Sequence, residues 1–578
     1  MIILGVNQSH DAGAALIKDN KIVSVINEER LNGIKNYWGF PSKSIDLVLK
    51  ESNVLPSEVD KVAVSNLSMV GGTEGSNPKD RMLNIYSKNQ IELGKRLMYF
   101  ASNFGFIETL TFSKLCLLIG RLRSISKIQD MKKYLKNIGI KAPVELVEHH
   151  HAHACTAFLT SPYKESLVYT SDFMGDFICG TVYECNEDGM KRIKEVPFYV
   201  SPGMVYGWIT YYLGFVPGKH EGKITGLAAY GDSNKTYNQF ADYLKLSENK
   251  GDYVRNIKRF WYLNAIERFS KDFNGISREH VAAGLQKRFE DVVSENVNYY
   301  VKKTNFRTVA LAGGIFANVR LNQRILELET VDNVFIHPAM TDGGLALGAA
   351  LALYEKDKKE HNEKLKSFNF ENVYFGPQYS DHEIEEEIKK SKLNYEYVEN
   401  IEKEAAELLS NKKIVARFNG RMEYGPRALG NRSILCHASD KTINDWLNKR
   451  LNRTDFMPFA PVSMEKFAKQ SYQNLEGGEK AAKFMTMTFY VTDNFAKECP
   501  AVTHLDNTAR PQIINENDNL SYYNILKEYH KITGIPTIIN TSFNMHEWPI
   551  VCNPQNAIQS FTEGKLDYLA IGNYLLKN

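Results

Sequence analysis

The sequence has 578 residues, which is too long for a single hydrophobic core, so we expect more than one domain. Its hydrophobic content of 43% and charged content of 24% are typical of a globular protein. The formal net charge of +3 is small for this length, so charge provides no bulk attraction to nucleic acid or to an anionic membrane. We expect neither as a partner.

The cysteines and apolar segments predict the compartment. The seven cysteines are scattered, form no CxxC pair and are odd in number, which argues against a zinc ribbon or a disulfide framework. No apolar run reaches membrane-spanning length, and the first residues lack the basic region of a signal peptide. The expectation is a cytoplasmic protein with reduced thiols.

The chain begins with three predicted strands, at 2–6, 14–17 and 21–26. A polar loop of small residues at 7–13 separates the first two strands. In such a loop His10 would point into a cleft, although a capping or surface role would explain it equally well.

The next two segments favour helices. Residues 41–60 have apolar side chains at helical spacing after a Pro-Ser start. Region 70–135 opens with a Gly-rich loop and continues with a sequence rich in Leu, Lys and Arg. We interpret it as a helical insertion whose basic residues form a solvated face.

Four of the fourteen histidines fall within five residues, at 149, 150, 151 and 153. A short apolar strand at 144–147 leads into them, and the following residues favour a helix. His149 and His153 then lie one helical turn apart on the same face, which is the spacing of two imidazole ligands to one metal ion. A helix start with solvent-exposed histidines is the alternative.

Two aspartates at the ends of predicted strands could complete such a site. Asp172 ends the strand 166–171, and Asp342 follows the strand 334–338 at the start of an Ala/Gly-rich helix. A turn or a helix cap would also explain these two carboxylates. Two histidines and an aspartate with open positions suit divalent iron, with manganese or zinc as alternatives.

Glycine-rich segments indicate an anion or nucleotide cradle in the same half of the chain. In 218–231, glycines let backbone N–H groups approach phosphates and Lys223 supplies positive charge, although this is not a Walker A motif. A strand at 308–312 leads into a Gly-Gly pair and a helix with Asn318, an arrangement that suits a phosphate and an adenosine.

A charged run at 355–366 is interpreted as a solvated boundary between domains. Beyond it, a Gly-rich loop at 420–433 holds Arg421, Arg427 and Arg432. Arginines among glycines are costly unless they hold an anion, and their guanidinium groups suit bidentate phosphate contacts. Surface solvation would explain some of them. Further polar clusters surround Arg510 and occupy the loop 540–544.

Together these motifs resemble the O-carbamoyltransferases of the nodulation-factor and antibiotic-tailoring type. The match covers nearly the whole length, its blocks follow the family's order, and the arginine loop is the most specific of them. The matching blocks are 149–154, 222–231, 313–318, 341–344, 420–433, 458–461 and 540–544.

The resemblance implies an α/β fold with two domains. Residues 1–358 would form a domain with the actin-like/sugar-kinase-like ATPase fold, similar to the universal tRNA threonylcarbamoyl transferase, with the helical insertion near 70–135. Residues 359–578 would form an α/β domain similar to threonylcarbamoyl-adenylate synthase.

The resemblance also implies an ATP-dependent reaction. The C-terminal domain would take carbamoyl phosphate and ATP with Mg²⁺, release phosphate, and join carbamate to the α-phosphate as carbamoyl adenylate, with loss of pyrophosphate. The N-terminal metal site, with Fe²⁺ or another divalent ion, would transfer the carbamoyl group to a hydroxyl. A small hydroxylated acceptor and a second copy of the chain, in a homodimer, are the expected partners.

Carried over by position, the resemblance assigns roles to individual residues. The implied iron ligands are His149, His153, Asp172 and Asp342. The implied contacts with carbamoyl adenylate are His153, Asp172, Gly203, Gly314 and Asn318, and further nucleotide or co-substrate contacts are Lys223, Gly313, Asn540 and Thr541. His10 would take the proton of the acceptor hydroxyl as a neutral imidazole. Arg421, Arg427, Arg510 and Ser542 would hold carbamoyl phosphate and ATP.

The chain departs from the family's pattern near the Pro-Phe-Ala-Pro block. Leu451 and Met457 stand where the family often has Lys and Arg. Lys449, Arg450 or Arg453 is then the candidate cation for carbamoyl phosphate.

Two alternatives keep part of this interpretation. Threonylcarbamoyl transfer to tRNA would use the same fold, but the chain lacks a basic stripe for nucleic acid. A non-catalytic nucleotide-binding protein would not need intact arginine and His/Asp blocks. The related hydrogenase-maturation carbamoyltransferase carries zinc-binding CxxC pairs, which this chain lacks.

Overall fold

The computed structural model describes residues 1–68, 109–256, 262–451 and 459–578. These residues form two compact units, one of residues 1–28 and 36–370 and the other of residues 29–35 and 371–578. The sequence placed the boundary at 358, inside the charged run. In the structure the first part of that run completes helix α12, which ends at Glu360.

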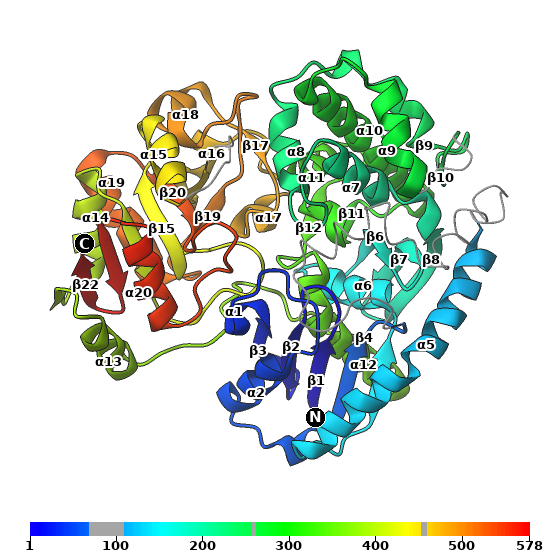
Figure 1. Cartoon of the computed structure of the whole chain (residues 1–578), viewed down its shortest axis with the longest axis horizontal. Helices are drawn as coiled ribbons and strands as arrows, with labels where there is room; N and C mark the ends of the chain where they lie inside the picture. The colour runs from blue at the N-terminus through cyan, green and yellow to red at the C-terminus, as the bar shows by residue number, and fades with distance from the viewer. Residues whose placement is uncertain (69–108, 257–261, 452–458) are drawn as a thin grey trace. The chain divides into compact units, whose positions relative to one another are not determined.

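The first unit contains two five-stranded sheets with the same topology (Figure 1). In the first sheet, β1, β2 and β3 form an antiparallel meander, and β4 and β5 are added in parallel on the other side of β1. In the second sheet, β6, β7 and β8 form the meander, and β11 and β12 are added beside β6. The strands are β1 Ile2–Asn7, β2 Gly13–Lys18, β3 Lys21–Asn27, β4 Lys61–Ser65, β5 Val144–Val147, β6 Ser166–Gly175, β7 Ile178–Asn186, β8 Gly189–Pro197, β11 Thr308–Ala312 and β12 Asn333–Ile336.

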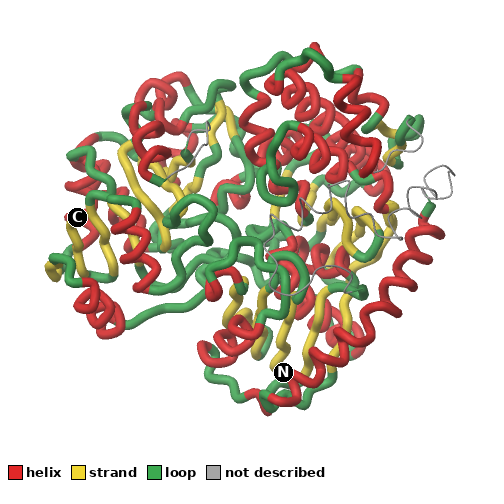
Figure 2. Tube along the Cα trace, viewed as in Figure 1, coloured by secondary structure: helices red, strands yellow, loops and turns green. Residues whose placement is uncertain are grey.

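Helices α6 and α12 link the two sheets of this unit. Helix α12 packs on β1 and β4, helix α6 packs on β6 and β11, and the two helices pack against each other (Figure 2). The helices of the unit are α2 Ser42–Glu51, α5 Leu110–Asn137, α6 His149–Leu159, α7 Pro202–Tyr212, α8 Glu221–Ala228, α9 Tyr262–Asp272, α10 Arg278–Thr304, α11 Val319–Leu326 and α12 Leu345–Glu360, and a small ribbon joins β9 Lys245–Leu246 to β10 Tyr253–Val254. This duplicated arrangement is the actin-like ATPase fold, as the sequence predicted.

The second unit is built on one mixed sheet in the order β13-β22-β21-β14-β15-β20-β16-β19. Helices α14 and α19 pack against it and share its hydrophobic core. The strands are β13 Tyr395–Tyr397, β14 Val415–Phe418, β15 Arg432–His437, β16 Ala460–Met464, β19 Gln512–Ile514, β20 Thr537–Ser542, β21 Tyr568–Ile571 and β22 Tyr574–Lys577, with a separate pair β17 Phe489–Tyr490 and β18 Thr508–Ala509. The helices are α1 Glu29–Asn32, α13 Asp381–Ser391, α14 Ile401–Ser410, α15 Thr442–Arg450, α16 Ala468–Ser471, α17 Glu479–Lys483, α18 Asp493–Glu498, α19 Leu520–Thr533 and α20 Pro554–Glu563. The α/β fold class is thus confirmed for both units.

Several predicted elements differ in extent from the observed ones. The helix predicted over 41–60 ends at Glu51, and a short 3-10 turn precedes β4. Of the insertion predicted at 70–135, residues 69–108 lie outside the described part of the chain, and the remainder is the long helix α5. Among the described residues, no helix has both the length and the apolar character needed to cross a bilayer.

The close approach of α6 and α12 depends on Gly348. A Cβ atom at this position would lie 2.3 Å from the carbonyl oxygen of Ala152 on α6. We expect Gly348→Ala to destabilise the protein by about 1–3 kcal/mol, because the helices must separate to admit the methyl group. A lowered midpoint of thermal unfolding would show this.

Gly222→Ala is the matched control. Gly222 lies in helix α8, and its added Cβ would meet no atom within 4 Å. This substitution should be neutral or stabilising, since alanine is the better helix former. Equal destabilisation by both substitutions would contradict the packing argument.

Candidate functional site

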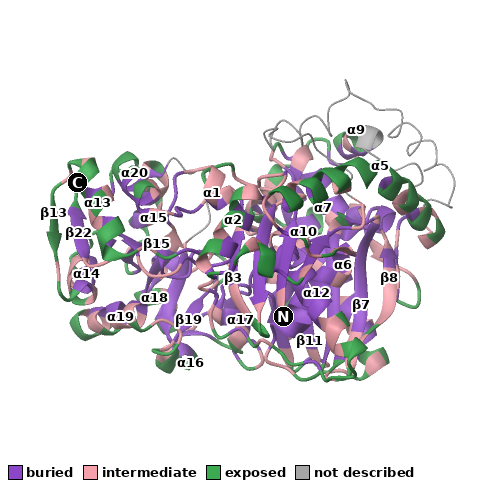
Figure 3. Cartoon of the chain, turned by 90° about the horizontal axis from the view of Figure 1, so that it is seen from below, coloured by how far each residue is buried: buried purple, intermediate pink, exposed green. Residues whose placement is uncertain are grey.

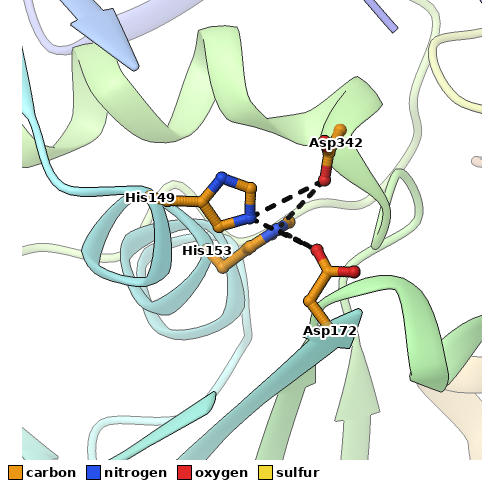
Figure 4. A group of neighbouring side chains, drawn as sticks. All are labelled: His149, His153, Asp172 and Asp342. Atoms are coloured by element: carbon orange, nitrogen blue, oxygen red, sulfur yellow. Dashed lines mark hydrogen bonds and ion pairs between the residues drawn. The ribbon is translucent and has the colours of Figure 1, made fainter. Parts of the chain in front are cut away.

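Four side chains from three segments of the first unit converge on one point (Figure 4). His149 and His153 project from α6, Asp172 lies in β6, and Asp342 begins the 3-10 turn that precedes α12. One ligand atom from each lies within 4.8 Å of the other three. Nε2 of His149 is 3.3 Å from Asp172 Oδ2 and 3.7 Å from Asp342 Oδ1. Nε2 of His153 is 3.5 and 3.7 Å from the same oxygens.

The donor set fits a divalent metal ion. Within the described part of the chain, both ring nitrogens of His153 are buried without a hydrogen bond, which is costly unless Nε2 serves as a ligand. Burial would raise the pKa of Asp172, but its contacts with His149 and His153 hold that pKa well below its usual value. The four residues that the sequence named as metal ligands thus lie together, with two imidazole nitrogens facing two carboxylate groups, and their binding of a metal ion stays a prediction.

Asn66 orients the first histidine. Its Oδ1 lies 2.7 Å from Nδ1 of His149, while its amide nitrogen donates to the hydroxyls of Ser9 and Ser65. The amide orientation makes Oδ1 an acceptor, so Nδ1 of His149 carries a proton, and when the ring is neutral Nε2 presents its lone pair to the site. Neither motif nor spacing pointed to Asn66, which is 83 residues from His149 in the chain.

Two carboxylates fix the first turn of α6. Glu148 caps the helix by accepting from the backbone N–H groups of His150 and His151, and it pairs with Arg192 from β8. Asp176 accepts from the backbone N–H of His149 and also from Leu67 and Ser68 N–H. These bonds satisfy donors that a helix start leaves unpaired.

A glycine makes room for the His149 ring. A Cβ atom at Gly175 would lie 2.1 Å from Cγ and Cδ2 of His149. The turn between β6 and β7 therefore requires glycine at this position. The sequence signal was present in the Met-Gly-Asp turn after Asp172, but only the structure connects this turn to the histidine.

The two unassigned histidines of the cluster have structural roles. His150 is fully buried and lies 3.0 Å from the Thr170 hydroxyl and 3.3 Å from the Ile178 carbonyl. Burial and the neighbouring His149 lower the pKa of His150 to about 3, so it stays neutral. His151 contacts the Tyr183 hydroxyl on the other side of the helix. The cluster is a buried helix start and not a solvent-exposed one.

The first loop lies beside the metal ligands. Asn7 donates to the carbonyls of His10, Asp11 and Asp342, which ties this loop to the second aspartate. Nδ1 of His10 is 3.3 Å from Asp11 Oδ2. Burial disfavours a charged His10, but Asp11, and also Asp342 and Asp172, outweigh this cost and raise its pKa to about 9.

Three glycines that the resemblance assigned to the nucleotide surround Asp172. Cβ atoms at Gly203 and Gly314 would lie 3.0 Å from the Asp172 carbonyl oxygen and Oδ1, respectively. Gly313 has φ +108°, and a Cβ there would lie 2.1 Å from the Ser171 carbonyl oxygen. Backbone N–H groups can therefore approach a ligand at this edge of the sheet without side chains intervening.

Asn318 and Lys223, two further residues assigned to the nucleotide, lie elsewhere in the same unit. Asn318 caps α11 through its side-chain oxygen, and its carboxamide pairs with that of Gln286 on α10. Lys223 lies on α8 and is half-buried. Glu221 is the first residue of α8. Burial raises the pKa of Glu221, and the charge of His10 opposes this increase.

In the second unit, Arg427 and Arg510 form a cationic pair for which the described residues provide no carboxylate partner. Among the same residues, the Nε atoms of both find no hydrogen-bond acceptor and are buried. Burial lowers the pKa of Arg427 to about 10, and burial together with the charge of Arg427 lowers the pKa of Arg510 well below its ordinary value. Two like charges held together at such cost are typical of an anion site.

Arg432 has a different role from the one its sequence context predicted. It lies over the Phe418 ring at 3.7 Å, and its guanidinium donates to four backbone carbonyls, those of Asn419, Asn431, Pro377 and Gly420. Its donors thus hold the loop rather than a phosphate.

Arg421 and Glu423 also shape the arginine loop. Arg421 donates to the carbonyls of Gly376 and Phe375. Oε1 of Glu423 accepts from three backbone N–H groups, those of Leu429, Asn431 and Arg432. Sequence reasoning missed Glu423 because its carboxylate binds backbone, which leaves no residue pattern.

The last predicted block is at the end of β20, which pairs with β15. Asn540 donates to the carbonyl of Ala428, next to Arg427, and to Gln512, while Thr541 and Ser542 complete the strand. Of the candidate replacement cations, Arg450 stacks on Trp446 at 3.8 Å. Arg453 and Met457 lie outside the described residues.

Models of known protein families match most of the chain. The model of the carbamoyltransferase N-terminus matches residues 2–351, and that of the carbamoyltransferase C-terminus matches residues 406–578. This chain is a member of the carbamoyltransferase family. The carbamoyltransferase thus carries the family's two parts in sequence order.

Full-length relatives agree with this assignment. The nodulation protein NolNO of Sinorhizobium fredii is 30% identical, and the match covers 98% of this carbamoyltransferase and 79% of NolNO. The uncharacterized protein MJ1058 of Methanocaldococcus jannaschii is 32% identical over 100% of this chain and 99% of its own. Among solved structures, full-length HypF in its phosphate- and nucleotide-bound form matches 63% of this chain and 47% of its own, with 13% identity and a TM-score of 0.33.

Removing the orienting amide should weaken metal binding. We expect Asn66→Gly to lower the affinity of the carbamoyltransferase for Co²⁺ about 10–100-fold, because the His149 ring loses its acceptor. Glycine adds no strain, since Asn66 has φ +75°. Metal affinity would be measured by competition with a chelating dye. Asn66→Asp retains an acceptor and should restore most of the affinity; equal loss in both variants would contradict the orienting role.

Metal binding should also depend on pH. Burial opposes a charged His149, but Asp342 and Asp172 outweigh it and raise its pKa to about 9. His149 must lose this proton to become a ligand, so Co²⁺ affinity should rise about tenfold per pH unit below pH 9 and level off above it. Titration at pH 6.5 to 9.5, with proton release measured in buffers of different ionisation enthalpy, tests this. A flat profile would exclude His149 as a ligand.

Proposed function

We propose that this carbamoyltransferase is an ATP-dependent O-carbamoyltransferase acting on a small hydroxylated metabolite. The observation that carries the proposal is the His149, His153, Asp172 and Asp342 constellation in a chain of this family. Fe²⁺ is the proposed ion, since two histidines with carboxylates and open positions suit it. The proposed acceptor class follows from the near-neutral charge, which does not favour a nucleic acid.

The second unit would make the activated carbamoyl group. Carbamoyl phosphate would lose phosphate to water, giving carbamate, and a carbamate oxygen would attack the α-phosphate of ATP bound with Mg²⁺. Pyrophosphate leaves, and carbamoyl adenylate forms. We assign the neutralisation of these phosphates to Arg427 and Arg510, a proposal supported by the lack of a compensating carboxylate for either charge within the described residues. A buried cationic pocket would also protect carbamate, a weak nucleophile, from side reactions.

The first unit would transfer the group. A divalent ion held by the four ligands would polarise the carbamoyl carbonyl and stabilise the negative charge that develops on its oxygen. Gly203 and Gly314 lie against Asp172 without side chains of their own, and we assign the binding of carbamoyl adenylate to this edge of the site. The acceptor oxygen attacks the carbamoyl carbon, AMP leaves, and His10 takes the hydroxyl proton. When Asp172 and Asp342 are engaged as ligands, they no longer raise the pKa of His10 as strongly, which favours its neutral, accepting form.

The two half-reactions should separate by mutation. Arg510→Gln should reduce acceptor-independent pyrophosphate release from carbamoyl phosphate and ATP by about 100-fold or more, because an electrostatic donor is lost. Asp342→Asn should leave this release intact and abolish carbamoyl transfer to a panel of hydroxylated metabolites. Mass spectrometry of the metabolites would measure the transfer.

Lys531→Gln serves as the matched control in the second unit. Lys531 is exposed on α19 and its ammonium lies 2.7 Å from Glu528, so its charge is compensated and pyrophosphate release should change little. A wild-type protein that releases no pyrophosphate from these substrates would overturn the proposed function. A fully active Arg510→Gln variant would overturn only the proposed anion site.

A further inference from the structure

Helix α5 has an exposed side along much of its length (Figure 3). Several large apolar residues of the helix are exposed. The residues buried against the body of the unit include small ones, namely Ser113, Gly120 and Ser124. The exposed apolar residues are Leu115, Leu118, Ile119, Leu122 and Ile125, each between 44% and 62% exposed. We call these five residues the α5 stripe. Their spacing of three and four places them on one face of the helix, opposite the small residues.

Basic side chains border the α5 stripe on both sides. At 100° per residue, Lys114 and Arg121 lie along one edge of the stripe, and Arg123 and Lys127 along the other. All four are exposed. An apolar centre with Lys and Arg at its edges is the pattern of a helix that lies in a lipid–water interface, where the long basic side chains reach the headgroups.

The charge of α5 is not typical of the whole chain. Leu110–Asn137 contains seven Lys or Arg residues and one Asp, a net charge of +6, so the rest of the chain together carries −3 of the overall +3. The sequence contains no acidic residue between 110 and 129. Near neutrality of the total charge therefore conceals a strongly basic helix, and the expectation of no membrane partner, which rested on that total, does not apply locally.

The charge pattern decides between possible occupants of the α5 stripe. A second copy of the chain, paired through the same helix, would place basic edges against basic edges, and residues 110–129 of the helix contain no acidic side chain to compensate them, although Lys114 lies 3.8 Å from Glu195. A surface that is both apolar and anionic satisfies the stripe and its edges at once. We propose that α5 docks this protein on an anionic lipid surface, with the α5 stripe inserted at the level of the acyl-chain boundary and the basic edges on the headgroup phosphates.

Vesicle flotation of the full-length protein tests the proposal. The wild type should float with vesicles of phosphatidylcholine containing phosphatidylglycerol, and much less with pure phosphatidylcholine. Leu118→Gln with Leu122→Gln should lower the partition coefficient about tenfold, because apolar burial is lost. Arg121→Gln with Arg123→Gln should lower it about fivefold per charge removed, and added salt should reduce this electrostatic part.

Leu505→Gln is the matched control. Leu505 is 61% exposed, as Leu122 is 62% exposed, but it lies in the second unit, so its substitution should leave flotation unchanged. All variants should keep the wild-type unfolding midpoint, since the substituted side chains face solvent.

Three results would overturn the proposal. The first is wild-type flotation that is absent or equal for neutral and anionic vesicles. The second is a concentration-dependent dimer in analytical ultracentrifugation that the leucine double variant abolishes, which would assign the α5 stripe to a second copy. The third is a large loss of thermal stability in the leucine double variant, which would mean that a segment of the same chain, such as residues 69–108, covers it.

Discussion

Four ionisable side chains with little access to water must share one small volume, and the architecture of the first unit serves this requirement. Asp172 and Asp342 repel each other, and His153 has no hydrogen-bonding partner for either ring nitrogen among the residues that the structure describes. A divalent cation would resolve all of these costs together, because it would attract both carboxylates and accept both imidazole lone pairs. The close packing of α6 on α12, and the carboxylates that cap α6, hold the ligands in place without the ion.

In the second unit, two positively charged side chains lie close together, as the two carboxylates do in the first unit. Arg427 and Arg510 are buried near each other, and the loop that carries Arg427 is held by other residues, chiefly Arg432 and Glu423. The Arg432 guanidinium donates to backbone carbonyls, and backbone N–H groups of the loop donate to the Glu423 carboxylate. The loop is thus stiff enough to keep two guanidinium groups together in the absence of an anion, which lowers the ordering cost when a phosphate binds.

Sequence reasoning selected residues that the structure brings together where their positions depend on local spacing. His149 and His153 are one helical turn apart in any helix, and Asp172 follows an apolar run that is recognisable by itself, although β6 continues beyond it to Gly175. It could not find Asn66 or Gly175, because the contacts of these residues with His149 arise only when distant strands meet. It also could not separate Arg432 from Arg427, since the two lie in the same glycine-rich loop and differ only in which partners the fold provides.

The two sheets of the repeated topology both contribute residues to the candidate metal site. The helix after the fifth strand of the first sheet supplies His149 and His153, and the segment after the fifth strand of the second sheet supplies Asp342. Asp172 comes from the first strand of the second sheet. The ion would therefore be held between the two halves of the repeated arrangement, with ligands from both. By linkage, any motion that parts the halves must weaken metal binding, and metal binding must oppose that motion equally. The ion would then fasten the duplicated halves together in addition to its part in the chemistry.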